Sequence, residues 1–239
     1  TTLAATLGVT NAEILFGVIL SQLISPGTPV IYGNTSSIID MQHIAFSIGA
    51  PELSLIVAAS AQLFRYYGLP FRAGGSLTDA KTLDVQAGYE SMLSLSTTYL
   101  CGTDFIFHGV GILDSFMSFS FDKFIIDEEI GLMVKRFYQG IEVNDDTLAY
   151  DLITSKGSGG NFLATPHTAK NFRREFFQPR VSRRQHYSQW ANGKEGAQEL
   201  GRKSWQKRLA DYTIPDIEPG LKKGLIHYYE KLYGLPKGL

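Results

Sequence analysis

Apolar and polar positions alternate along the chain in a unit that occurs three times. Each copy has apolar residues at helical spacing, then a Gly or Pro turn, then a short β-rich run with a polar end. The copies are "NAEILFGVILSQLISPGTPVIYGNTSS", "APELSLIVAASAQLFRYYGLPFRAGGS" and "DVQAGYESMLSLSTTYLCGTDFIFHGVGI". They predict strands over residues 30–32, 70–73 and 104–107, and helices that begin at an Asn11 cap and end at Gly68 and Gly102.

A helix that leads by a tight turn into each new strand lays down a parallel sheet with right-handed crossovers. The pattern therefore predicts an α/β fold of the TIM type, a (β/α)8 barrel. A complete barrel needs about 250 residues, and no more than four strands are visible before Ile112. We expect residues 1–239 to form a single domain that is the C-terminal portion of a barrel, with an N-terminal portion missing.

The rest of the chain predicts helices. Residues 113–150 have helical spacing, and a Gly-rich turn then leads to a helix with Thr165 as cap and Pro166 in its first turn. Charged and apolar positions alternate at helical spacing over residues 180–239. We interpret this segment as a helical tail packed on the barrel, with its charges on a solvated face.

Polar residues follow the predicted strands at the end where the active sites of such barrels lie. These residues are found in Tyr32-Gly33-Asn34-Thr35, in Gly74-Gly75-Ser76 with Asp79, and in Phe107-His108-Gly109. We expect all three stretches to share one rim. The alternative is that the glycines only make turns and that Ser76 or Thr78 caps the next helix.

Composition narrows the class of protein. The 22 Lys and Arg residues nearly balance the 23 Asp and Glu residues, so a nucleic-acid partner is not indicated. The only cysteine, Cys101, excludes a disulfide framework and the Cys pairs of a structural zinc site, which favours a reducing cytoplasm. We find no signal-peptide pattern and no apolar run close to the roughly 18 residues of a membrane span. The sequence predicts a soluble protein that does not contact a membrane.

Four long stretches resemble, in collinear order, the trimethylamine methyltransferase family. They are "GNTSSIIDM", "GAPELSLIVAASAQLFRYYGLPFRAGGSLTDAKTLDVQAGYES", "GTDFIFHGVGILDS" and "GGNFLATPHTAKNFRREFF". The resemblance implies a TIM-type barrel on a longer chain. It also implies a cobamide-dependent methyltransferase that moves a methyl group from a methylated amine to the Co(I) of a separate corrinoid protein.

Founding members of that family carry pyrrolysine, which we place in or near "AGGSLTDAK". This sequence has only standard residues there. The resemblance therefore points to the branch that lacks pyrrolysine, whose members demethylate quaternary amines such as glycine betaine.

Such a substrate has a cation, which aromatic faces bind, and a carboxylate, which needs hydrogen-bond donors. We interpret His108 and Asp79 as catalytic residues. The predicted substrate-binding residues are Tyr32, Asn34, Gly74, Gly75, Ser76, Phe107, Phe162 and His167. No metal ligands are predicted.

Structural alternatives remain for these residues. The aromatic rings can pack in the core, His108 can be a rim histidine, His167 can belong to a helix start, and Asp79 can join Lys81 and Asp84 in a local ion pair.

Two other functions stay open. Another barrel enzyme, such as a lyase, would use Lys81 as a buried amine or a metal held by carboxylates. A non-catalytic paralogue would bind a methylated amine without transferring methyl. Part of a barrel has open strand edges that need covering by the missing part or by another chain, and we also expect a homo-oligomer.

Overall fold

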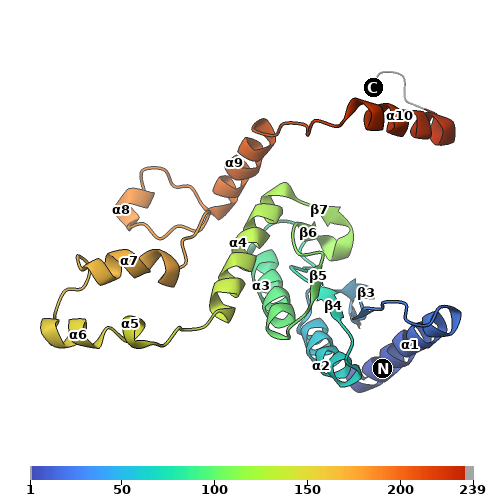
Figure 1. Cartoon of the computed structure of the whole chain (residues 1–239), viewed down its shortest axis with the longest axis horizontal. Coiled ribbons are helices and arrows are strands. Elements are labelled where there is room, and N and C mark those ends of the chain that lie inside the picture. The colour runs from blue at the N-terminus through green and yellow to red at the C-terminus, as the bar shows by residue number, and fades with distance from the viewer. Residues whose placement is uncertain (1, 235–239) are drawn as a thin grey trace. The chain divides into compact units, whose positions relative to one another are not determined.

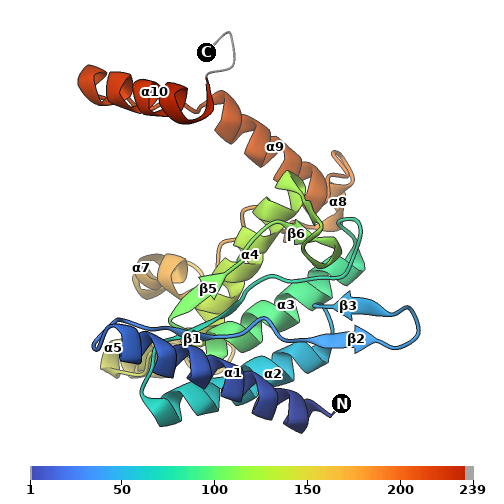
Figure 2. The same cartoon turned by 90° about the vertical axis from the view of Figure 1, so that its right-hand side faces the viewer.

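The sheet at the centre of the computed structural model, which describes residues 2–234, has three parallel strands. β1 (Tyr32–Gly33), β4 (Phe71–Gly74) and β5 (Phe105–Phe107) lie side by side in that order, with Tyr32 opposite Phe71 and Arg72 opposite Phe105. A long helix precedes each strand, namely α1 (Leu3–Ile24), α2 (Pro51–Tyr67) and α3 (Val85–Leu100). The predicted repeating unit and its parallel strands are confirmed (Figures 1 and 2).

The two faces of this sheet differ. Side chains alternate across a strand, and Tyr32, Phe71 and Ala73 are buried in a core that includes Val57 and Phe64 of α2. On the opposite face, Phe105 is 51% and Phe107 is 40% exposed. The described residues form an open parallel sheet with one covered face, and a closed barrel remains a prediction.

Caps at the helix ends follow the local sequence. Asp84 accepts a hydrogen bond from the backbone N–H of Ala87 at the start of α3, and Gly68 ends α2 at a φ of +66°. Thr165 caps α7 (Pro166–Glu175) as predicted. The predicted Asn11 cap is wrong, because α1 begins at Leu3 with Thr2 as its cap. The Asn11 side chain instead contacts the hydroxyl groups of the core tyrosines 32 and 67.

Two short antiparallel ribbons follow strands of the central sheet. β2 (Ile38–Asp40) pairs with β3 (Ala45–Ser47) after β1, and β6 (Ile112–Leu113) pairs with β7 (Ser118–Phe119) after β5. A 3₁₀ turn, η1 (Asp114–Phe116), joins β6 to β7. The prediction of helix from residue 113 onward is therefore wrong at its start, and α4 (Phe121–Tyr138) begins only after the second ribbon.

Helix α4 anchors later segments of the chain. Its Glu129 carboxylate accepts hydrogen bonds from the backbone N–H groups of Arg180 and Ser182, and Asp122 pairs with Arg202. The helices of this region are α5 (Asp145–Leu148), α6 (Tyr150–Lys156), α7, α8 (Tyr187–Trp190) and α9 (Ala197–Ala210).

The chain divides into two compact units, residues 1–205 and residues 206–239. The second unit starts within α9 and contains α10 (Pro219–Tyr233). Pro219 occupies the start of α10, and the Glu218 carboxylate before it accepts hydrogen bonds from the backbone N–H groups of residues 220 and 221. This helix therefore has its own N-terminal cap.

Helix α1 has the length and apolar composition of a membrane-spanning helix, with a mean hydropathy of 1.8 over its most apolar window. The prediction that no apolar run approaches this length is wrong. The core helix of a soluble protein and a signal sequence meet the same two criteria, but only 6% of the apolar window of α1 is buried within the described residues. Helix α1 contacts α2 through the Asn11 and Tyr67 side chains. Length and composition therefore do not assign α1 to a membrane.

Candidate functional site

A largely apolar hollow of about 10 Å³, room for about one water molecule, lies where the three parallel strands end. Asn34 and Thr35 reach it after β1, Gly74 lines it from β4, and Phe107 and His108 line it at the end of β5. Its other lining residues are Ile48, Leu53, Val57, Arg72, Leu77 and Phe116. An open groove of about 440 Å³ shares Asn34, Thr35 and Arg72 with this hollow and is also lined by Ile31, Gly33 and Phe105. The structure thus brings the three predicted rim stretches together, because parallel strands present their C-terminal ends at one edge.

Backbone strain is concentrated around this hollow. Of the seven non-glycine residues with positive φ in the described structure, His108, Asp114, Ser115 and Phe116 lie in the segment just after β5. Hydrogen bonds from the backbone N–H groups of residues 114 and 115 to the carbonyl groups of residues 80 and 78 hold this segment in place. Such conformations persist where the surrounding structure enforces them, and they cluster at functional sites.

Arg72 places a positive charge at the hollow. Its guanidinium lies over the Phe107 ring at 4.9 Å from the centroid and donates a hydrogen bond of 3.3 Å to the carbonyl oxygen of Asn34. Within residues 2–234, no carboxylate forms an ion pair with Arg72. Among the described residues, the printed partners of the Arg72 guanidinium are therefore a ring face and a carbonyl oxygen.

His108 lies beside this cation. Its ring contacts the rings of Phe107 and Phe116, at centroid distances of 4.1 and 4.9 Å. Burial among these rings, together with the charge of Arg72, lowers the pKa of His108 below its ordinary value. The imidazole is therefore neutral at neutral pH, and it offers one N–H donor and one acceptor.

Asp79 holds loops together and is absent from the lining of the hollow. One carboxylate oxygen accepts hydrogen bonds of 2.7 Å from the Ile48 N–H and the Ser115 hydroxyl, and the other accepts the Ser47 hydroxyl. Burial acts to raise the pKa of Asp79, but these hydrogen bonds outweigh it, and the pKa falls below its ordinary value. With both oxygens committed, the geometry favours a structural role over the catalytic role predicted from the sequence.

Gly75 and Ser76 lie beneath the rim. A Cβ on Gly75 would come within 2.6 Å of the Gly109 Cα, so a side chain does not fit there. Ser76 is fully buried, and its carbonyl oxygen accepts a hydrogen bond of 3.1 Å from the Lys123 amine. Neither residue lines the hollow, and Ser76 does not cap α3.

Lys123 and Asp127 of α4 form a buried ion pair below these loops. The side chains are 0% and 1% exposed, and 2.6 Å separates Nζ from Oδ2. The backbone N–H of Gly111 also donates to this oxygen, at 2.7 Å. Burial lowers the pKa of Lys123 and raises that of Asp127 to about 6. The pair thereby connects the loops that follow β4 and β5.

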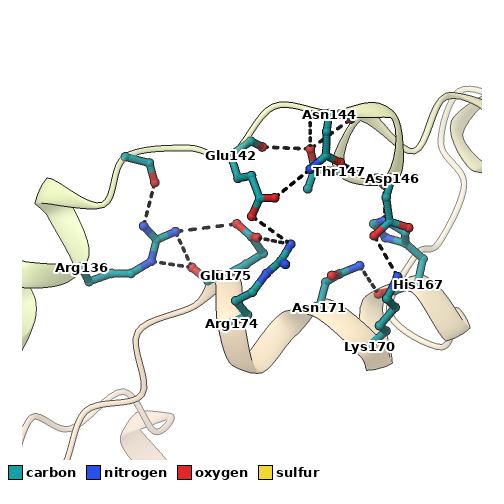
Figure 3. Close-up of polar contacts among 11 residues, drawn as sticks. Arg136, Glu142, Asn144, Asp146, Thr147, His167, Lys170, Asn171, Arg174 and Glu175 are labelled. Carbon is teal, nitrogen blue, oxygen red and sulfur yellow. Dashed lines mark hydrogen bonds and ion pairs between the residues drawn. The ribbon is translucent and has the colours of Figure 1, made fainter.

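Three other predicted site residues lie elsewhere. Tyr32 is 1% exposed and packs among core rings on the covered face of the sheet. The Phe162 carbonyl oxygen accepts hydrogen bonds in the turn that begins α7. The His167 Nε2 lies 2.7 Å from the carbonyl oxygen of Asp146, in a polar cluster between α5 and α7 (Figure 3). None of the three lines the hollow.

The described residues hold no group of three or more His, Cys, Asp or Glu side chains arranged for a metal ion. Lys81 is 69% exposed and forms an ion pair of 2.5 Å with Asp114, so it is not the buried amine that a lyase would need. It does not pair with Asp79 or Asp84 through their carboxylates, although its amine donates to the carbonyl oxygen of Asp79.

The chain matches a known protein family over nearly its whole length. The family model described as trimethylamine methyltransferase (MTTB) matches residues 1–232. The chain belongs to the trimethylamine methyltransferase family. This confirms the resemblance based on the four sequence stretches, and it brings the helices after α4 within the family's own sequence.

Relatives within the trimethylamine methyltransferase family have several substrates in their names. A glycine betaine methyltransferase of Desulfitobacterium hafniense (strain Y51) is 48% identical over 217 residues, which cover 91% of this chain and 45% of that protein. A proline betaine:corrinoid methyltransferase of Eubacterium limosum is 40% identical over 222 residues, covering 91% and 46%. The trimethylamine methyltransferase MttB of D. hafniense (strain DSM 10664 / DCB-2) is 34% identical over 244 residues, covering 100% and 48%. The chain spans about half the length of these relatives.

Sequence reasoning missed Arg72 at this hollow. The signal for Arg72 was its place between two core residues: Phe71 and Ala73 are buried, so period-two alternation directs Arg72 to the open face. Phe116 reaches the hollow through a turn with positive φ at three successive residues.

Proposed function

We propose that the protein containing this chain is a corrinoid-dependent methyltransferase that demethylates a quaternary amine bearing a carboxylate, such as glycine betaine. The observation that carries the proposal is Arg72, a cation without a carboxylate partner among residues 2–234, next to a neutral histidine on an aromatic face. A lone cation repels a simple ammonium and attracts a carboxylate. The 48% identity to a glycine betaine methyltransferase supports the same substrate class.

The reaction needs little from the protein beyond positioning. The lone pair of Co(I) attacks the methyl carbon, the C–N bond breaks, and its electron pair returns to nitrogen. A quaternary amine leaves as a neutral tertiary amine, so no acid has to protonate it. The corrinoid, carried by a partner protein, is the methyl acceptor. Co(I) is a strong reductant, and we therefore place the protein in the cytoplasm.

Each part of the substrate has a matching group. We propose that Arg72 and His108 bind the carboxylate, and that the faces of Phe107 and Phe105 lie beside the ammonium. Positive charge leaves nitrogen during the transfer, so a complete aromatic cage would stabilise the substrate more than the transition state. A site with an arginine and only one aromatic wall fits this requirement.

The first experiment follows the cobalt spectrum of cob(I)alamin with the full-length protein and trimethylamine, glycine betaine, carnitine or proline betaine. We expect methylcob(III)alamin with a betaine and none with trimethylamine. Binding without methyl transfer would identify a non-catalytic paralogue, and transfer from trimethylamine alone would refute the carboxylate argument.

The role of Arg72 is tested with Arg72→Gln. Hydrogen bonds to charged groups contribute about 1.5–3 kcal/mol, so kcat/KM for the betaine should fall by roughly 10- to 150-fold. Tetramethylammonium, which has no carboxylate, should react no more slowly than with the wild type. Arg65→Gln is a matched control, because Arg65 also lies over a phenylalanine ring but is absent from the lining of the hollow. Equal losses with both substrates would contradict the proposed pairing.

We also propose a homo-oligomer. β1 and β5 each pair on one side only within the described residues, and such edges are covered either by the rest of the full-length protein or by another chain. Light scattering on the full-length protein measures its mass, and a monomer would refute this part of the proposal.

A further inference from the structure

Two loops at the rim touch each other directly. We name residues 75–79 the β4 loop and residues 108–111 the β5 loop. The Gly75 N–H donates a hydrogen bond of 2.9 Å to the carbonyl oxygen of the last residue of β5, and a Cβ on Gly75 would lie 2.6 Å from the Gly109 Cα. His108 lies between these two contacts in the sequence. The position of its ring at the hollow therefore depends on how the two loops are held.

Helix α3 holds the β4 loop. The Glu90 carboxylate accepts hydrogen bonds from the Thr78 hydroxyl and the Asp79 N–H, at 2.6 and 2.8 Å. One turn further along the helix, the Ser94 hydroxyl accepts the Leu77 N–H at 3.1 Å. These contacts fix the β4 loop on the side of α3, and a different helix connects it to the β5 loop.

The buried pair of Lys123 and Asp127 on α4 makes this connection. The Lys123 amine donates to the Ser76 carbonyl oxygen of the β4 loop at 3.1 Å and to Asp127 at 2.6 Å. The same oxygen of Asp127 accepts the Gly111 N–H of the β5 loop at 2.7 Å. All four residues are buried. A continuous line of hydrogen bonds therefore joins the two loops, and the described residues enclose it completely.

Stability alone does not account for this pair. Taking two charges out of water is costly, and apolar residues of similar volume often stabilise a protein as well or better. The carboxylate of Glu90 acts on the Lys123 amine from α3 and favours its charged form. Two apolar side chains would offer no donor to Ser76 and no acceptor to Gly111. What the pair provides is a set of directional contacts that fixes one loop relative to the other.

We propose that Lys123 and Asp127 are positioning residues, which fix the β5 loop and its His108 at a set distance from Arg72 on β4. This inference rests on the proposed function, in which Arg72 and His108 bind one carboxylate. Two donors that share an anion must keep their separation, and a displacement of about 1 Å can lower a rate about 100-fold. Neither Lys123 nor Asp127 lines the hollow, so both act through the loops.

The test uses two double variants of the full-length protein, both without an unpaired buried charge. The conservative variant, Lys123→Met/Asp127→Asn, removes the donor to Ser76 but keeps an acceptor for the Gly111 N–H. The apolar variant, Lys123→Met/Asp127→Leu, removes both. Glu129→Leu is the matched control, because Glu129 is also a buried carboxylate of α4 that accepts backbone N–H groups, but from residues that do not line the hollow. Circular dichroism checks that each variant is folded at the assay temperature.

The first readout is the titration of His108, followed by nuclear magnetic resonance and assigned with His108→Gln. Burial among aromatic rings and the charge of Arg72 lower the pKa of His108 in the wild type. We expect this pKa to rise towards its ordinary value in the apolar variant, because a released loop exposes the imidazole to water. The conservative variant should show a smaller rise, and the control should match the wild type.

The second readout is methyl transfer from glycine betaine to cob(I)alamin. We expect kcat to fall about tenfold or more in the apolar variant. KM should change less, since Arg72 stays in place on β4. The conservative variant should recover part of the rate, and the control should match the wild type.

A kcat and a His108 pKa that equal those of the wild type in the apolar variant would overturn the positioning role. Equal changes in Glu129→Leu would also overturn it, because they would show a general loosening of the fold. If the apolar variant does not fold, the conservative variant decides, and it must shift both quantities in the stated directions. Absence of methyl transfer by the wild type would overturn the proposed function, and the His108 titration would still decide whether the pair fixes the loop.

Discussion

Replacing Lys123 by methionine should destabilise the protein in a strongly pH-dependent way. Methionine has a similar length and no charge, so the change leaves the buried Asp127 carboxylate without its counter-charge. The side chains of the pair are 0% and 1% exposed, so water cannot solvate the remaining charge. The Gly111 N–H still donates to the carboxylate, while the Ser76 carbonyl oxygen loses the lysine amine as donor.

The size of the effect follows from the ionisation of Asp127. Breaking a buried pair costs about 3–5 kcal/mol while the remaining group is charged. Burial raises the pKa of Asp127 to about 6 even with the lysine present, and without it the pKa rises further. A carboxyl group whose pKa is raised on folding contributes most stability below its unfolded pKa and loses it as the pH rises through the folded value. We expect a loss of about 4 kcal/mol at pH 8. At pH 5 the protonated carboxyl leaves only the lost hydrogen bond, about 1 kcal/mol.

Urea denaturation at pH 5, 6.5 and 8 measures this dependence through the free energies of unfolding of wild type and variant. The double variant Lys123→Met/Asp127→Asn is the control, because an amide accepts the Gly111 N–H without a charge. The loss of unfolding free energy in the single variant should increase from pH 5 to pH 8. The corresponding loss in the double variant should not increase over this range. A single-variant loss that is equal at all three pH values, or greater at pH 5, would refute the reasoning.

Three further predictions concern single residues. Gly75→Ala should lower the free energy of unfolding by about 2 kcal/mol, because its Cβ would meet the Gly109 backbone; an unchanged midpoint in urea would contradict this. Glu129→Gln should speed amide hydrogen exchange at residues 180–182, and unchanged exchange there would show that its backbone hydrogen bonds contribute little. Ile44→Asn alone should raise the unfolding free energy by about 1 kcal/mol, since a left-handed conformation costs a β-branched residue about that much. Thermal unfolding measures this change, and a melting temperature below that of the wild type would contradict the prediction.

The sequence predicted the parts of the fold that depend on local periodicity. The helices before β4 and β5 and the glycine that ends α2 followed from apolar spacing and turn chemistry. The rim also followed, because parallel strands have a common C-terminal edge. His108 and Phe107 were placed at the hollow by this rule alone.

Features that depend on tertiary contacts were missed. Lys123 and Asp127 are four residues apart, a spacing that usually indicates an exposed pair on a helix, yet α3 and the loops bury both. The β2–β3 hairpin was missed because Ile44 occupies a turn position where glycine or asparagine is expected. Tyr32 was assigned to the rim because strand alternation does not itself say which face a helix covers.

The order of strands in the sheet has a consequence for how the protein is made. Each parallel strand pairs with the parallel strand before it in sequence, and every residue that lines the hollow lies between residues 34 and 116. As the chain leaves the ribosome, β4 can dock on β1 and β5 on β4 without any later segment threading between them. The walls of the hollow can thus assemble during synthesis, before the helices after α4 exist, and folding of this region depends on contacts between successive units.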